Sequence, residues 1–202
     1  MGKRHQIYIR VPEIDYGENN PNNRPERIIG FHHQWLYGAT ACEVLFNFLT
    51  FFEKHRENQE YNIFTSFRAL EELDMLCQFI LSYYPDNAGF EGMHDISDTA
   101  CIENPHFGDN NDGITVIDIS NINDPKYCFA SLGFTNSSDL RMAEGAYCAK
   151  DYLSSYYKEA VWPEVQGRGG QDIVSTMARL EKYPVISFDQ LKEIFPKWRE
   201  NK

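Results

Sequence analysis

The sequence lacks any long apolar run, and it lacks the short motifs that mark common catalytic sites. No window reaches the ~18 consecutive apolar residues that a membrane helix needs. No apolar run of signal-peptide length follows the N-terminus. It contains no H-E-x-x-H zinc motif, no P-loop and no dinucleotide-binding fingerprint. We therefore expect a cytoplasmic protein with no membrane partner and no resident cofactor.

Positive charge is also scarce. The 202 residues include 19 Lys and Arg against 30 Asp and Glu, a formal net charge of −11. A field of that sign repels phosphate backbones over the whole surface. We therefore do not expect general binding to nucleic acid.

The few cysteines show no pattern of a metal site or a disulfide framework. They are odd in number and include no C-x-x-C pair, and most fall in apolar segments. We interpret them as reduced core residues of a cytosolic protein. The five are Cys42, Cys77, Cys101, Cys128 and Cys148. Cys42 and Cys128 each lie in an apolar pattern without a local base, which favours structural thiols over nucleophiles.

Large apolar side chains are abundant: hydrophobic residues make up 42% of the chain and aromatic residues 14%. This composition and length predict one globular domain spanning residues 1–202, with a helical C-terminal part from about residue 137. No repeat or composition break divides the chain.

Strand patterns come in pairs. Residues His5 to Val11 alternate apolar and polar, and the stretch Arg27 to Tyr37 predicts a second strand after a turn-rich segment, 13–26. A hairpin is predicted from Ile114 to Ile119 and Lys126 to Leu132. No helix or strand pattern is recognised between Asp86 and Asp112.

Helix patterns separate and follow these pairs. Thr40 and Glu43 form a capping box that predicts a helix start, and an apolar stripe follows it. Its members are Ala41, Val44, Leu45, Phe48, Leu49 and Phe52. Further helices are predicted over Ser66–Tyr83, Ser137–Lys158 and Gln171–Lys182. A second capping box, Ser187 with Gln190, is flanked by Ile186 and Leu191 at the positions of a hydrophobic staple, and it begins the last helix.

This order predicts an α+β fold with a mainly antiparallel sheet and helices packed on it. From Gly2 to Leu132 the order is similar to the α/β/β/α sandwich of N-terminal-nucleophile hydrolases. That family attacks with an N-terminal Cys, Ser or Thr, whereas removal of Met1 would expose Gly2. Inheriting that activity would need cleavage elsewhere, such as at Thr40 or Ser66.

Two stretches carry a second resemblance. Lys3-Arg-His-Gln and Gly30-Phe-His-His-Gln-Trp-Leu-Tyr-Gly38 resemble uncharacterised proteins of phage and bacterial genomes. The resemblance implies no catalytic residue.

The first candidate site combines basic, amide and aromatic side chains on two neighbouring strands. Alternation puts His32 and Gln34 on one face of the second strand and leaves His33 with the core residues on the other. Such groups beside aromatic rings suit a planar or phosphorylated ligand. The alternative is a set of hydrogen-bonded polar groups in the core. The predicted ligand-binding residues are Tyr8, Arg10, His32, Gln34, Tyr37 and Arg168.

Arg168 enters this set from a glycine-rich loop, Gly167 to Gly170, that precedes a predicted helix. Backbone N–H groups and the helix dipole there would hold an anion, or the segment is a plain connecting loop.

An acidic segment offers a candidate divalent-metal site. Its spacing fits neither a zinc nor a calcium signature, so a solvated loop is favoured and no metal is expected. Its residues are His94, Asp95, Asp98, His106, Asp109 and Asp112.

The absence of catalytic signatures favours a non-catalytic cytosolic protein that binds a small anionic or nucleotide-like ligand. In a phage, such a protein would sequester a signalling nucleotide. The alternatives are a metal-dependent or amidohydrolase-type hydrolase and, third, an oligomerising protein-interaction module.

Overall fold

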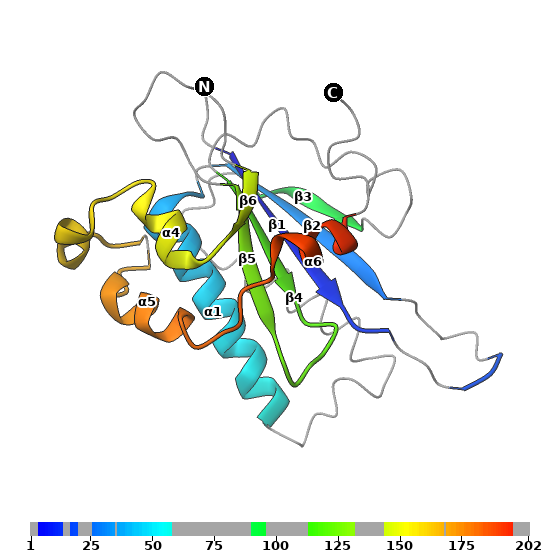
Figure 1. Cartoon of the computed structure of the whole chain (residues 1–202). Helices are drawn as coiled ribbons and strands as arrows, with labels where there is room; N and C mark the ends of the chain where they lie inside the picture. Colours follow the sequence, from blue (N-terminus) through cyan, green and yellow to red (C-terminus); the bar gives the residue numbers. More distant parts are fainter. Residues whose placement is uncertain are drawn as a thin grey trace.

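The computed structural model describes residues 4–13, 17–19, 26–34, 36–57, 90–95, 113–131, 144–167 and 169–195 (Figure 1). For most of β2 and all of β3 this description covers the backbone alone. The predicted helix over Ser66–Tyr83 and most of the segments 13–26 and 86–112 lie outside these residues.

One mixed sheet forms the centre of the fold. Its strands are β1 (Arg4–Val11), β2 (Arg27–Gln34), β3 (Phe90–Asp95), β4 (Ile114–Asp118), β5 (Lys126–Ser131) and β6 (Glu144–Tyr147). They are arranged in the order β3-β2-β1-β4-β5-β6. Every neighbouring pair is antiparallel except β1 and β4, which run parallel. The mainly antiparallel α+β prediction is confirmed. All six described strands belong to this sheet, so they do not form the two-sheet sandwich.

Most of the helices cover one face of the sheet. The helices on this face are α1 (Gly38–Glu57), α4 (Ala149–Ser154), the 3-10 helix η2 (Glu159–Glu164) and α5 (Ile173–Leu180). The predicted stripe of α1 is confirmed, because all six of its residues are buried in the core on this face. The odd-numbered residues Ile7, Ile9 and Val11 of β1 point into the same core.

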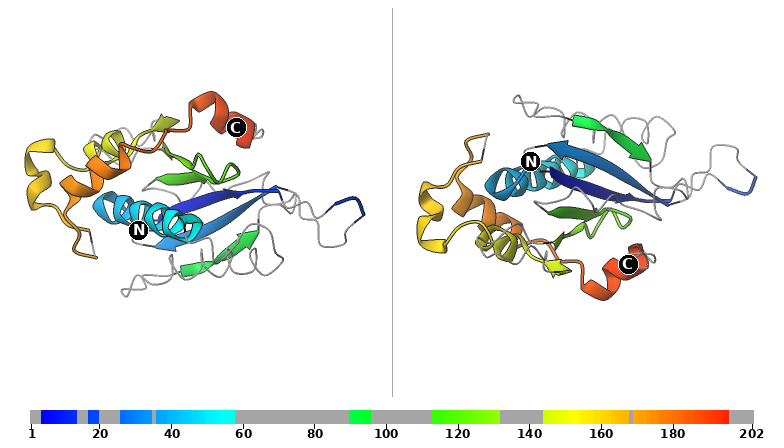
Figure 2. Two further views of the ribbon diagram at one scale, coloured as in Figure 1. Left: turned by 90° about the horizontal axis from the view of Figure 1, so that it is seen from below. Right: turned by 90° about the horizontal axis from the view of Figure 1, so that it is seen from above.

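The last helix, α6 (Phe188–Ile194), covers the other face. Its Leu191 and Ile194 are buried in a second core with Tyr8 and Val116. Figure 2 shows α1, α4 and α5 together and α6 well apart from them. The predicted capping box between Ser187 and Gln190 is present with both hydrogen bonds, and the staple residues on either side of it are buried. Phe188, in contrast, is 40% exposed and lies under the ammonium group of Lys192.

Two predictions about strands are wrong. The segment that showed no pattern contains β3, which pairs with β2 and forms an edge of the sheet. Residues 144–147, expected within a long helix, form β6 and pair with β5. Gly145 explains the second error, since glycine weakens a helix. In the strand, a Cβ atom on residue 145 would lie only 2.7 Å from the ring of Tyr147.

Helix starts were predicted with mixed success. The prediction of a capping box at Thr40 and Glu43 is wrong, because α1 begins at Gly38 and the Glu43 carboxylate binds a distant loop. The helix predicted from Gln171 is confirmed as α5, which Asp172 caps by accepting from the N–H groups of Val174 and Ser175. Its buried residues are Ile173, Thr176, Met177 and Leu180, whereas Val174 is 45% exposed.

The cysteines divide into two kinds. Cys42 and Cys128 are buried and unpaired, as predicted, and burial raises the pKa of both thiols. Cys148 was expected in the core, but it is half-buried and caps α4, where its sulfur accepts from the N–H of Asp151.

No helix in the described ranges combines the length and the apolar character required to cross a membrane.

Candidate functional site

Arg10, at the centre of the predicted site, is bound to two carboxylates. Its Nε donates to Glu26 at 2.7 Å and one terminal nitrogen donates to Asp118 at 3.0 Å. Partial burial opposes the charge, but the hydrogen bonds and negative charges of these partners hold the pKa of Arg10 above its ordinary value. Its positive charge is therefore already compensated within the protein.

Tyr8 is a core residue. Its ring is 3% exposed and meets Phe195 edge-on, with ring centroids 5.4 Å apart. Its hydroxyl donates to the side-chain oxygen of Gln6. It lies against α6, so it matches the core alternative for this set of residues.

Gln34, another of the predicted residues, lies away from Arg10. Arg10 pairs with Ile28 and Gln34 pairs with Arg4, a difference of six positions along the strands. That is roughly 20 Å at ~3.3 Å per residue. Tyr37 follows β2 and lies beside Tyr156, with ring centroids 6.1 Å apart. His32 pairs with Gln6; for His32 and Gln34 the backbone alone is described, and Arg168 lies outside the described residues. The described members of the set therefore do not meet around Arg10.

The glycine-rich loop does hold an anion, and that anion is a side chain of the protein. The N–H groups of Gly169 and Gln171 donate to the Glu43 carboxylate, at 2.9 and 3.1 Å. Glu43 is 1% exposed, on the first half of α1. Gln171 adds a second link to α1, because its side-chain amide donates to Asn47 at 2.7 Å. The loop thus fastens the start of α5 to α1.

This attachment requires glycine at two positions. A Cβ at Gly167 or Gly169 would lie 2.1 or 2.4 Å from a Glu43 carboxylate oxygen. By contrast, nothing lies within 4 Å of a Cβ at Gly170, where φ is +74°.

Gly167→Ala is expected to destabilise the protein by about 1–3 kcal/mol, since crowding a packed site forces side chains and backbone to shift. Gly170→Ala is the matched control, because it meets only the backbone strain of a positive φ, about 1 kcal/mol. Chemical denaturation of both variants measures the difference. Equal losses at the two positions would contradict the steric role assigned to Gly167.

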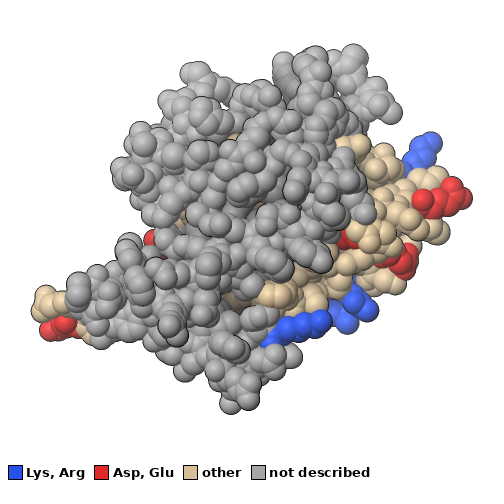
Figure 3. Space-filling model, turned by 180° about the vertical axis from the view of Figure 1, so that it is seen from behind, with Lys and Arg blue, Asp and Glu red and all other residues tan. Residues whose placement is uncertain are grey.

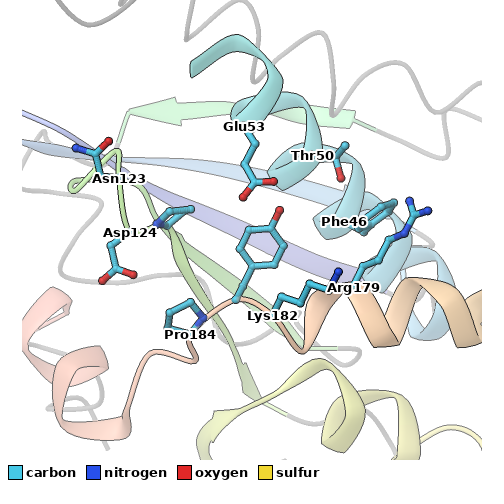
Figure 4. A pocket seen from close by; sticks show the side chains of 10 residues that line it. Phe46, Thr50, Glu53, Asn123, Asp124, Arg179, Lys182 and Pro184 are labelled. Carbon is cyan, nitrogen blue, oxygen red and sulfur yellow. The ribbon is translucent and has the colours of Figure 1, made fainter. Parts of the chain in front are cut away.

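A cleft of about 500 Å³ lies at the opposite end of α5 (Figure 4). Three elements build it: one side of α1, the β4–β5 turn, and the end of α5 with the segment that follows. Its residues are Phe46, Thr50, Glu53, Asn123, Asp124, Pro125, Arg179, Lys182, Tyr183 and Pro184. Phe46, Thr50 and Glu53 follow the i, i+4, i+7 spacing of a single helix face.

Among the described residues, the two cations of the cleft have no carboxylate partner. Within the described part of the chain, Arg10, Lys126, Lys150 and Lys192 all form ion pairs. No described acidic group pairs with Arg179 or Lys182, and the Arg179 guanidinium instead lies over the Phe46 ring, 5.3 Å from its centroid. Arg179 and Lys182 thus place two positive charges in a cleft whose other charged residues, Glu53 and Asp124, are acidic.

On the face opposite to that of Figure 1, acidic and basic side chains of the described surface stand in separate small groups, without one large patch of either sign (Figure 3). The described residues hold no group of three side chains suited to a metal ion. Of the acidic segment, only His94 and Asp95 fall in a described element, β3.

Sequence reasoning missed every residue of this cleft. A signal existed within single elements, since Arg179 and Lys182 are one helical turn apart and Phe46 precedes Thr50 and Glu53 at helical spacing. The approach of α1, the β4–β5 turn and α5 to one another is a tertiary feature, which no local pattern reports.

Comparison of the chain with protein-family models, with curated proteins and with solved structures finds no match. The function is therefore argued from the geometry of the cleft.

Proposed function

We propose that this is a cytoplasmic, non-catalytic binding protein whose cleft between α1, the β4–β5 turn and the end of α5 receives a small anionic, nucleotide-like ligand. One observation carries the proposal: Arg179 and Lys182 line a cleft of about 500 Å³ without a carboxylate partner among the described residues. That volume lies in the range of small-molecule sites.

The contact between Arg179 and Phe46 supports an anion as the ligand. A guanidinium that stacks on an aromatic face keeps its N–H groups at its edge, where they match the oxygens of a phosphate or carboxylate. The ring also replaces part of the water around the cation, which strengthens a charge-assisted hydrogen bond to the ligand. Lys182 adds a second positive charge one turn further on.

The composition of the cleft favours binding over hydrolysis. Its ten residues include no His, Cys or Ser, so it lacks the usual pairs of nucleophile and base. In a phage, to which the resemblance of the N-terminal stretches points, capture of a signalling nucleotide is the role that such a cleft would serve.

Titration calorimetry with a panel of nucleoside mono-, di- and triphosphates tests the proposal. Arg179→Ala should weaken binding roughly ten- to hundredfold, because a hydrogen bond to a charged group contributes about 1.5–3 kcal/mol. Lys158→Ala is the matched control, since Lys158 is an exposed cation that does not line the cleft. It should leave the affinity unchanged.

Two results would contradict the proposal. The first is that the wild-type protein binds no member of the panel at millimolar concentration. The second is that Arg179→Ala binds the ligand as tightly as the wild type does. Loss of binding in His32→Ala but not in Arg179→Ala would move the site to the predicted residues on β2.

A further inference from the structure

The two ends of the cleft differ in chemistry. Figure 4 shows Arg179 beside Phe46 on one side and Asn123 with Asp124 on the other, with Glu53 projecting from α1 between them. One end therefore offers hydrogen-bond donors with positive charge. The rest of the cleft offers mainly acceptors.

Glu53 is the acceptor best placed to contact a ligand. It is half-buried, it lines the cleft, and no described cation pairs with it. Asp124 is less available, because it forms an ion pair with Lys126 at 3.2 Å. An ionised carboxylate only accepts, and its two oxygens suit two parallel donors on one rigid edge.

Among the common bases, guanine presents such an edge, with the N1–H and the exocyclic amino group side by side. Adenine and cytosine place an amino group next to a ring nitrogen that accepts, and uracil places one N–H between two carbonyl oxygens. Each of those edges would turn an acceptor toward one of the carboxylate oxygens. A site whose acceptor is left unmatched rejects such a ligand strongly.

We propose that the cleft selects guanine nucleotides, with Glu53 accepting from N1–H and the exocyclic amino group and with Arg179 and Lys182 binding the phosphate. This inference rests on the proposed function, because it names the ligand class of the same cleft. Tyr183, which also lines the cleft, supplies aromatic surface beside which the planar base lies.

The test compares ligands that differ by one group. GMP and IMP share every atom of the purine edge except the exocyclic amino group, and XMP carries an oxygen in its place. Calorimetry on the full-length protein should show GMP binding about tenfold or more tighter than IMP, with XMP and AMP weaker still.

Two variants separate the base from the phosphate. Glu53→Gln should weaken GMP more than IMP and so remove most of the preference for GMP, because the Gln oxygen can still accept from N1–H while its NH2 group faces the exocyclic amino group. Arg179→Ala should weaken GMP and IMP by the same factor. Glu181→Gln, at an exposed position after α5 that does not line the cleft, is the control and should match the wild type.

The outcomes distinguish the two proposals. Equal affinities for GMP, IMP and AMP, all weakened by Arg179→Ala, would overturn the guanine assignment and leave the anion-binding cleft in place. Preference for GMP that survives Glu53→Gln would overturn the role of Glu53. Failure of every nucleotide to bind would overturn the proposed function and this inference together.

Discussion

Replacement of Glu43 by Ala is expected to lower the free energy of unfolding by about 3–5 kcal/mol. The buried carboxylate accepts from the N–H groups of Gly169 and Gln171, and hydrogen bonds to charged groups contribute about 1.5–3 kcal/mol each. The truncation also leaves the two donors without their acceptor at a partly buried position. Urea denaturation followed by circular dichroism measures the loss, provided that the slope of the unfolding free energy against urea concentration is the same in the variant and the wild type.

Two companion variants sharpen this measurement. Glu43→Gln keeps one acceptor oxygen and should cost less than Glu43→Ala. Glu159→Ala removes a carboxylate from an exposed ion pair with Lys150 and should cost below about 1 kcal/mol. A loss in Glu43→Ala as small as that of the control would show that the loop is held by other contacts.

The same substitution should affect the ligand. Glu43 fastens the start of α5, and the end of that helix carries Arg179 into the cleft. We therefore expect Glu43→Ala to weaken nucleotide binding even where the protein remains folded. Glu43 acts here as a positioning residue, so the affinity should fall without a change in the preference among bases.

Tyr152→Ala is the second large effect, with an expected loss of about 3–5 kcal/mol in the free energy of unfolding. The ring is completely buried and stacks on Phe129, with centroids 3.9 Å apart and planes within 4°. The imidazole of His5 meets it edge-on at 6.0 Å. Removal of the ring opens a cavity between α4 and the sheet, which thermal and chemical denaturation both measure.

The hydroxyl of Tyr152 makes a smaller, separable contribution. It accepts from the N–H of Gly38 at the start of α1, at 3.3 Å, and donates toward the hydroxyl of Tyr156 at 3.4 Å. Tyr152→Phe should therefore cost about 1 kcal/mol. If Tyr152→Phe destabilised as much as Tyr152→Ala, the hydroxyl rather than the stacked ring would hold this region.

Alkaline pH gives an independent readout of the hydroxyl. Burial, reinforced by Tyr156, raises the pKa of Tyr152 well above its ordinary value. The folded state then keeps a proton that the unfolded state loses, so this contribution to stability is full below the ordinary tyrosine pKa and declines as the pH rises above it. Tyr152→Phe should lose less stability over that alkaline range than the wild type does.

Elements with a strong internal pattern were predictable from sequence. The apolar stripe of α1, the β4–β5 hairpin and the capping box of α6 each depend on residues close together in the chain. Helix α5 was found for the same reason, from its apolar residues after a glycine loop. In these segments local preference and tertiary packing agree.

The errors occur where a distant partner decides the structure. Glu43 matched the spacing of a capping box, but its carboxylate is bound 126 and 128 residues further on, at Gly169 and Gln171. Strand β3 is stabilised by pairing with β2, and no pattern in the sequence of β3 itself indicates a strand. Arg10 was chosen as an available cation, whereas Asp118, brought beside it by the parallel pairing of β1 and β4, compensates its charge.

That parallel pairing also sets the order in which the chain can fold. The first strand lies at the centre of the sheet, and its His5 is hydrogen-bonded to Thr115, 110 residues away. A contact of that separation carries a large loop-closure cost and slows folding. During synthesis, β1 and β2 leave the ribosome as a hairpin with two open edges: that of β2 stays unpaired until β3 emerges, and that of β1 until β4 emerges. We expect early interruption of translation to leave an aggregation-prone intermediate, which a chaperone would need to cover.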